Sequence, residues 1–344
     1  MKKNIIALAI ASVVAAPVAM AGAPTLYGDV NMVVEQVNEK NYAGKTIDAT
    51  SGTQVNSRAS KLGVKGSEDL GNGLSAVYKF EFEVQIDGAS TLKNRNQYVG
   101  LAGGFGTVLM GRHDTPLKMT QGTDLFNFSP LADIKVQAGG LGVTGSGGED
   151  RLSNVLAYVS PSFGGVTLVG AFVPKETGGD PTEESSLGDL MSFAVMYGSK
   201  KEGLYLSAAY NLFSEEFLNA ADSANEARLV AQYSTGGLVA NVMYQNFDGK
   251  AIEDTLNEGA TIGAGVAYKA GNFTPRVQIM QVDRKNSAVN TKAEDSFNYA
   301  LGVDYALGKK TRVYAEYAML DNIDGLKKTK AEQSAISIGL NHKF

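Results

Sequence analysis

The sequence predicts an all-β protein: a transmembrane antiparallel β-barrel of 16 strands with a third extracellular loop folded inward. Three observations predict it. Apolar and polar residues alternate over many segments, short and long connections take turns between them, and tyrosines gather near the segment ends. Alternation with period two indicates a strand with one apolar face, and about nine to eleven residues is the length that a tilted strand needs to cross a bilayer.

Residues 1–21 are predicted to be a secretory signal peptide, which leaves a barrel domain of residues 22–344. Lys2 and Lys3 precede a short apolar run, and the segment ends on Ala-Met-Ala, a small-x-small cleavage site. An N-terminal membrane anchor is the alternative. It is disfavoured because the apolar run is shorter than the roughly 20 residues of a spanning helix and is broken by Pro17.

Composition narrows the class of the mature chain. Loss of residues 1–21 removes two lysines and no acid, so the formal charge of −5 becomes −7, which argues against a nucleic-acid partner. The chain has no cysteine, and an exported, cysteine-free, acidic protein indicates a bacterial envelope. The 40 glycines, 15 tyrosines and 14 phenylalanines favour strands. With a mean hydropathy of −0.10, a soluble all-β protein is the competing interpretation, since alternation dilutes the hydropathy of a barrel.

Sixteen segments show the strand pattern. They are residues 25–37, 57–69, 74–86, 95–103, 106–115, 151–160, 165–174, 190–198, 203–213, 226–234, 238–248, 259–269, 273–284, 295–306, 311–320 and 333–344. The connections at 71–73, 103–106, 235–237 and 270–272 are short and rich in glycine, and they take turns with longer polar stretches. Short inner turns and longer outer loops are typical of an outer-membrane barrel.

The last segment and the aromatic residues favour the barrel over a soluble protein. Ile336, Ile338 and Leu340 share one face of a strand that runs to Phe344, whereas the ends of soluble chains usually fray. Aromatic residues also occur on the apolar face at both ends of the strands, as expected for two interfacial girdles. Before short turns these are Tyr158, Tyr197, Tyr233, Tyr268 and Tyr305, and before long loops they are Phe172, Tyr210, Tyr244 and Tyr317.

The blocks "LGVKGSEDLGNGL" and "YVGLAGGFGTVLMGR", together with the terminal "NHKF", resemble the Gram-negative general-diffusion porins. The resemblance covers nearly the whole mature chain. It implies a homotrimer of 16-stranded barrels in the outer membrane, in contact with lipid and lipopolysaccharide. Each barrel would pass ions and small hydrophilic solutes passively, and no cofactor is expected.

In that family the third outer loop folds into the barrel and faces basic residues on the wall. Here the loop spans residues 113–150, and the family's frequent acid-aromatic-glycine turn is absent from it. The resemblance implies a constriction made by six residues. They are Lys61, Arg95, Arg112 and Arg151 on the wall, and Asp124 and Asp133 in the loop.

Strand parity offers a test of the arginine pair. If Tyr98 and Leu109 face lipid, then Arg95 and Arg112, each an odd number of residues away, face the lumen. Such charges, set against loop carboxylates, would create a transverse field that discriminates between ions. The alternative is that both arginines are simply solvated residues of the channel lining.

Other functions find little support. The two histidines, His113 and His342, have no second histidine near them in sequence, so we expect neither catalysis nor a metal site. The glycine-rich run at 139–150 lacks the Gly-Lys-Ser/Thr ending of a phosphate-binding loop. A channel specific for a sugar or an anion remains the alternative to a general porin, because Phe126 and Phe128 lie in the third loop. An outer-membrane enzyme or adhesin is remote.

Overall fold

The computed structural model describes residues 23–40, 51–88, 91–141, 147–176, 185–218, 223–249, 258–286, 291–292, 295–324 and 329–344. The expected signal peptide and its cleavage point before Gly22 lie outside these residues. Within them nearly all regular structure is β, and the strands form one sheet. No helix among them is long and apolar enough to cross a membrane.

The sheet consists of long strands joined in chain order. They are β1 (Thr25–Lys40), β2 (Gly52–Ser57), β3 (Lys61–Gly71), β4 (Leu74–Val84), β5 (Leu92–Gly103), β6 (Gly106–Asp114), β7 (Arg151–Val159), β8 (Val166–Val173), β9 (Leu190–Gly198), β10 (Gly203–Phe213), β11 (Ala224–Thr235), β12 (Leu238–Asp248), β13 (Glu258–Tyr268), β14 (Phe273–Asn286), β15 (Thr291–Lys292), β16 (Ser296–Ala306), β17 (Thr311–Asp324) and β18 (Thr329–Lys343). A short helix, α4 (Glu215–Leu218), follows β10.

Sixteen of these elements count as spanning strands in the described chain. Both β2 and β3 pair with β1, so they are two parts of one strand with a break at residues 58–60. The two-residue β15 only extends the pairing at the end of β14. The predicted segment 57–69 therefore began too late, because the break at Arg58 interrupts the alternation.

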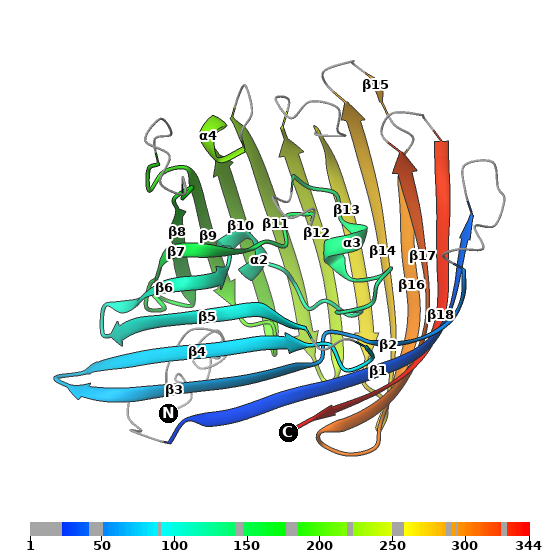
Figure 1. The fold of residues 1–344 in the computed structure, drawn as a ribbon, viewed down its shortest axis with the longest axis horizontal. Helices are drawn as coiled ribbons and strands as arrows, with labels where there is room; N and C mark the ends of the chain where they lie inside the picture. Colours follow the sequence, from blue (N-terminus) through cyan, green and yellow to red (C-terminus); the bar gives the residue numbers. More distant parts are fainter. Residues whose placement is uncertain are drawn as a thin grey trace.

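The sheet closes on itself. Each strand pairs antiparallel with the next, and β18 pairs with β1 from Asp29 opposite Lys343 to Lys40 opposite Glu332. Figure 1 shows the ring of strands, with the first and last strands side by side. A closed barrel leaves no unpaired strand edge in lipid. This confirms the predicted 16-stranded antiparallel barrel.

The alternation predicted from the sequence is the alternation of exposure. On β18, Ile336 and Ile338 are 59% and 64% exposed, whereas Ala335 and Ser337 between them are buried. The predicted girdle residues Tyr197, Tyr233, Tyr210 and Tyr244 are all exposed on the same outer face. The exposed face of these strands is therefore apolar, as expected of a lipid-facing surface.

An irregularity in the pairing of β4 with β5 overturns the parity argument for Arg95. Arg95 and Asn96 together oppose Glu81, because Phe80 pairs with Gln97 and Phe82 pairs with Asn94. Two residues against one is a β-bulge, which resets the faces of the strand beyond it. Because of this bulge, the odd offset between Tyr98 and Arg95 does not put their side chains on opposite faces of the strand.

Tyr98 and Leu109 do not face lipid. Leu109 is 1% exposed, and Tyr98 packs against the same buried cluster. The Tyr98 ring centroid also lies 5.2 Å from that of His113, which is buried. The exposed residues of β6 are instead Val108 and Met110.

Candidate functional site

The long connection between β6 and β7, residues 115–150, lies on the inner side of the barrel; we call it the inner loop. Residues 142–146 of it are outside the described chain. It carries two short helices, α2 (Pro116–Met119) and α3 (Ile134–Gln137), and Figure 1 shows both within the ring of strands. The wall residues that hold the loop alternate with the exposed apolar residues, so the loop covers the inner face.

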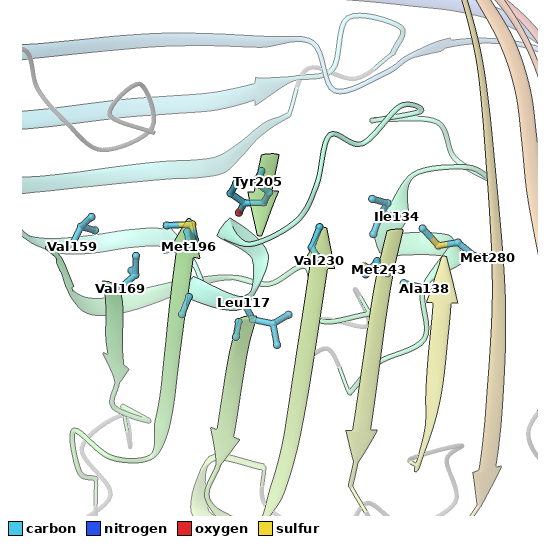
Figure 2. Close-up of a cluster of buried hydrophobic side chains, with 12 residues drawn as sticks. Leu117, Ile134, Ala138, Val159, Val169, Met196, Tyr205, Val230, Met243 and Met280 are labelled. Carbon is cyan, nitrogen blue, oxygen red and sulfur yellow. The ribbon is translucent and has the colours of Figure 1, made fainter. Parts of the chain in front are cut away.

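Apolar contacts fix the two helices to the wall. Leu117, Ile134 and Ala138 of the inner loop are at most 4% exposed and form one buried cluster with inward residues of the strands. Figure 2 shows Leu117 and Ile134 among cluster residues of the strands such as Met196, Val230 and Met280. This burial removes the loop from solvent, which offsets the entropy lost in ordering a long connection.

Polar side chains of successive strands bind the loop backbone. From β10, Tyr205 Oη and Ser207 Oγ donate to the carbonyl of Thr120 at 3.2 and 2.9 Å. Other carbonyls of the loop accept from Asn241, Gln245, Gln278 and Asn298, which lie on β12, β14 and β16. Buried backbone groups that lack strand or helix partners are satisfied in this way.

A buried ion pair adds to the anchoring. Arg228 on β11 is 1% exposed, and its guanidinium donates to Glu149 and to the carbonyl of Leu117. Burial raises the pKa of Glu149, although the charge of Arg228 opposes that rise. Removing one partner would leave a buried charge unpaired, which typically costs about 3–5 kcal/mol.

The tip of the inner loop presents an aromatic side chain to the wall of β3 and β5. Phe128 adopts a left-handed backbone conformation, with φ of 71°, which is rare for a bulky residue. Its ring centroid lies 5.4 Å from Lys61 Nζ and 5.5 Å from the guanidinium carbon of Arg95. The structure thus brings Lys61 and Arg95 together, opposite Phe128.

These two basic residues differ in their partners. Arg95 Nε donates to Glu81 at 2.7 Å, and Nη1 lies 3.4 Å from Glu83. Lys61 has no ion pair within the part of the chain that the structure describes. Lys79, a third basic residue, lies 3.2 Å from Glu81. Lys93 also pairs with Glu83, and Asp29 on β1 stands opposite Lys61 in the strand register.

The two loop carboxylates are engaged by the loop itself. Asp133 caps α3 by accepting from the amide of Lys135, and it also accepts from the amide of Phe128 at 2.8 Å. Asp124 accepts from the amides of Phe126 and Ile134. Burial and the neighbouring charge of Asp133 raise the pKa of Asp124 well above its ordinary value. Both acids therefore stabilise the loop conformation.

Arg151 and Arg112 have partners other than Phe128. Arg151 Nη2 is 3.0 Å from Asp114, and its Nε donates to Asn96 at 2.6 Å, so it holds the base of the inner loop. Arg112 pairs in register with Gln97, next to the pair formed by Met110 and Val99. That register puts Arg112 on the outward face, which differs from the expectation that it lines the lumen.

Sequence reasoning missed a second charged cluster on the inner wall. Arg58, at the break between β2 and β3, donates to Glu35, to Glu316 and to Ser337 Oγ. Arg276 lies 4.4 Å from the ring centroid of Phe126 and 3.1 Å from Glu316. Strand parity places Arg276 and Glu316 on the inner face, but only the closed barrel shows that they meet.

A comparison with known proteins now gives the class. A model of the Gram-negative porin family matches residues 7–325. The major outer membrane protein P.IB of Neisseria meningitidis is 31% identical to this chain, over 100% of both sequences. The chain therefore belongs to the Gram-negative porin family, and it forms a diffusion channel in the outer membrane. The family and the relatives' names indicate a channel rather than an enzyme.

Solved structures share the fold. An anion-selective porin from Comamonas acidovorans superposes with a TM-score of 0.71 at 24% identity, covering 94% of this chain and 99% of that one. The trimer form of OmpT from Vibrio cholerae gives 0.67 at 17% identity, covering 94% of this chain and 100% of that one. At these identities the likeness establishes the barrel architecture.

Proposed function

We propose that the channel is narrowest between the tip of the inner loop and the wall of β3 to β5, and that it favours small anions. The observation that carries this is the position of Phe128 opposite Lys61 and Arg95. The carboxylates of Asp124 and Asp133 accept hydrogen bonds from backbone amides of the loop, so they are directed at the loop itself rather than at these basic groups.

The wall carries further positive charge next to this point. Lys65 and Lys79 are directly opposite each other on β3 and β4, and both ammonium groups lie within 6.0 Å of the ring centroid of Tyr27. Like charges at opposed positions weaken a sheet. Two ammonium groups at such opposed positions support a role in the field that passing solutes experience.

The proposed constriction differs from the six residues that the resemblance to porins implied. Lys61 and Arg95 stay in it, and Lys79 joins them. Arg112 leaves because its strand register is outward. Arg151 leaves because its partners, Asp114 and Asn96, hold it at the base of the inner loop. The similarity to the anion-selective porin from Comamonas acidovorans supports the same preference.

We also infer that the chain acts as a homotrimer surrounded by lipid and lipopolysaccharide. The porin family and the trimer form of OmpT support this assembly. A sugar-specific channel is less well supported, because Phe126 is 1% exposed beneath Arg276 and cannot offer a second ring to solutes.

Reversal potentials in a salt gradient test the ion preference. We expect the wild-type channel to favour chloride over potassium, and Lys61→Gln and Arg95→Gln each to move the potential toward cations, with the largest shift in the double variant. Lys310→Gln, which removes a charge from the exposed turn after β16, is the matched control and should cause no shift. An unchanged potential in the double variant at low salt, where screening is weakest, would refute the proposed constriction.

A further inference from the structure

An apolar groove crosses the outer wall of the barrel from β9 to β13. Its volume is about 490 Å³. The hollow arises because two outward positions of its lining carry alanine, Ala208 on β10 and Ala231 on β11. In the strand register each alanine stands between larger apolar residues of the two neighbouring strands. The groove therefore lies where small side chains interrupt a row of large ones.

The floor of the groove is held in place from inside the barrel. Val230 and Met243, which lie between outward residues of β11 and β12, belong to the buried cluster that packs against the inner loop. Ser207, next to Ala208, donates to the carbonyl of Thr120 in the same loop. The wall is thus braced on its inner side, and a preformed site costs less to fill than one that must first become ordered.

The groove begins at the inner interface and rises to the middle of the bilayer. At its lower end lies Tyr197, next to the last residue of β9, which ends at an inner turn. At its upper end lies Ile262, six residues from Tyr268 at the inner end of β13. At about 3.3 Å per residue and a tilt of about 45°, six residues correspond to roughly 14 Å of depth. Half of a hydrocarbon core of about 30 Å is about 15 Å, so the groove spans one leaflet, the inner one.

The shape of the groove suits a single extended chain. It crosses from β9 to β13, which is about 19 Å at a strand spacing of about 4.8 Å. Along the strands its lining is short, for example residues 206–208 on β10 and 229–231 on β11. A hydrocarbon chain that fills such a hollow gains dispersion contacts that a flat wall does not offer.

The lower end of the groove offers polar groups to a lipid headgroup. Tyr197 is 44% exposed, and its ring lies in the inner girdle, where tyrosine contacts headgroups. Lys201, in the turn after β9, is exposed and makes no ion pair within the described residues. Glu202 is the one acid in that turn. The ammonium group of Lys201 would attract the phosphate of an anionic lipid.

We propose that the groove binds one acyl chain of an anionic phospholipid of the inner leaflet, with the phosphate of that lipid beside Tyr197 and Lys201. The inference rests on the proposed lipid surround and adds which strands hold an ordered lipid. A lipid of the outer leaflet has its headgroup at the other end of the strands, beyond the upper end of the groove at Ile262.

Tryptophan fluorescence tests the site, because the chain contains no tryptophan. The reporter is Ile262→Trp at the upper end of the groove, and the matched control is Leu301→Trp on β16; the two positions are 61% and 50% exposed. Phosphatidylglycerol with brominated acyl chains, which quench tryptophan, is titrated into each protein in detergent. We expect saturable quenching at position 262 and weak, linear quenching at position 301. Equal, linear quenching at both positions would overturn the inference.

Second substitutions in the Ile262→Trp protein test the two halves of the lipid. Lys201→Gln should weaken the saturable binding about fivefold, and Glu202→Gln should strengthen it; affinity that is the same in both would refute the headgroup position. Ala231→Phe fills the hollow and should abolish saturable quenching. Ala315→Phe, at an exposed position on β17, should leave it unchanged. Heat-modifiable mobility on gels confirms that each variant is a folded barrel.

The same reporter separates this inference from the proposed lipid surround. In bilayers of the brominated lipid, the tryptophan at position 262 is quenched if this wall faces lipid at all. No quenching there would refute the lipid surround. Quenching in bilayers without saturable binding in detergent would refute the groove site alone.

Discussion

The ring of Phe344 lies directly over Gly28, where the last strand meets the first. The two residues also exchange backbone hydrogen bonds, Gly28 N to Phe344 O at 3.3 Å and Phe344 N to Gly28 O at 3.1 Å. A Cβ atom on Gly28 would overlap the ring carbons of Phe344. The closure of the barrel at this end therefore depends on the absence of a side chain at position 28.

Replacing Gly28 by leucine is expected to displace the Phe344 ring and to lower the yield of folded barrel. Heat-modifiable mobility on gels after refolding in detergent measures that yield. Gly308→Ala is the control, because a Cβ atom there meets nothing within 4 Å and the site lies in the turn before β17. Equal yields for the two variants would show that the ring does not need the space above Gly28.

Neutralising Asp124 is expected to leave ion preference unchanged. Burial and the charge of Asp133 raise the pKa of Asp124, and its oxygens accept hydrogen bonds from two backbone amides of the loop. Asp124→Asn therefore removes little charge from the pore. Glu83→Gln is the comparison. Glu83 is on the inner wall beside Arg95 and Lys93, and its loss should move the reversal potential toward anions. A similar shift in Asp124→Asn would contradict this assignment.

Replacing Phe128 by asparagine is expected to raise the single-channel conductance and to preserve the preference for anions. The smaller side chain widens the space beside Lys61 and Arg95, both of which remain. Asparagine also tolerates the positive φ of this position better than phenylalanine. Phe105→Leu, in the exposed turn after β5, serves as the control. A conductance equal to that of the wild type would place the narrowest point elsewhere.

Alkaline pH is expected to stabilise the protein through Lys200, in the turn between β9 and β10. Its Nζ donates to the carbonyl of Met119 in the inner loop and lies 5.1 Å from the ring centroid of Tyr205. Burial lowers the pKa of Lys200 to about 8, with Glu149 opposing and Arg228 adding to that change.

The sign follows from proton binding. Between pH 8 and about 10.4, the ordinary lysine pKa, the unfolded chain holds more protons at this position than the folded one, so stability rises with pH in that window. The measurement is the melting temperature in detergent at pH 7.5 and pH 10 for the wild type and Lys200→Met. The rise should be larger in the wild type, and identical pH dependence in both would exclude this contribution.

Strand positions could be predicted because each strand carries its own signal. The segments predicted at 203–213 and 238–248 coincide with β10 and β12, since apolar residues must alternate wherever one face meets lipid. The outward tyrosines were found for the same reason. These features depend only on neighbours in sequence.

The candidate site was only partly predictable. Lys61 and Arg95 were identified from the resemblance. The bulge at Arg95, however, breaks the alternation from which Tyr98 was assigned to the lipid face. The capping role of Asp133 depends on where the four-residue helix α3 begins, and no periodicity marks so short an element. The break at residue 58 likewise depends on contacts that are remote in sequence.

That break has a consequence for the order of events in folding. Arg58 is held by Glu316 and Ser337, which are 258 and 279 positions away in the chain. Its guanidinium has these acceptors only after the last two strands are in place, because non-local contacts form only once the intervening chain is ordered. Until then, Glu35 on the neighbouring strand β1 is the one carboxylate of this cluster that can pair with Arg58. The earliest part of this barrel to be synthesised is thus among the last to reach its final state.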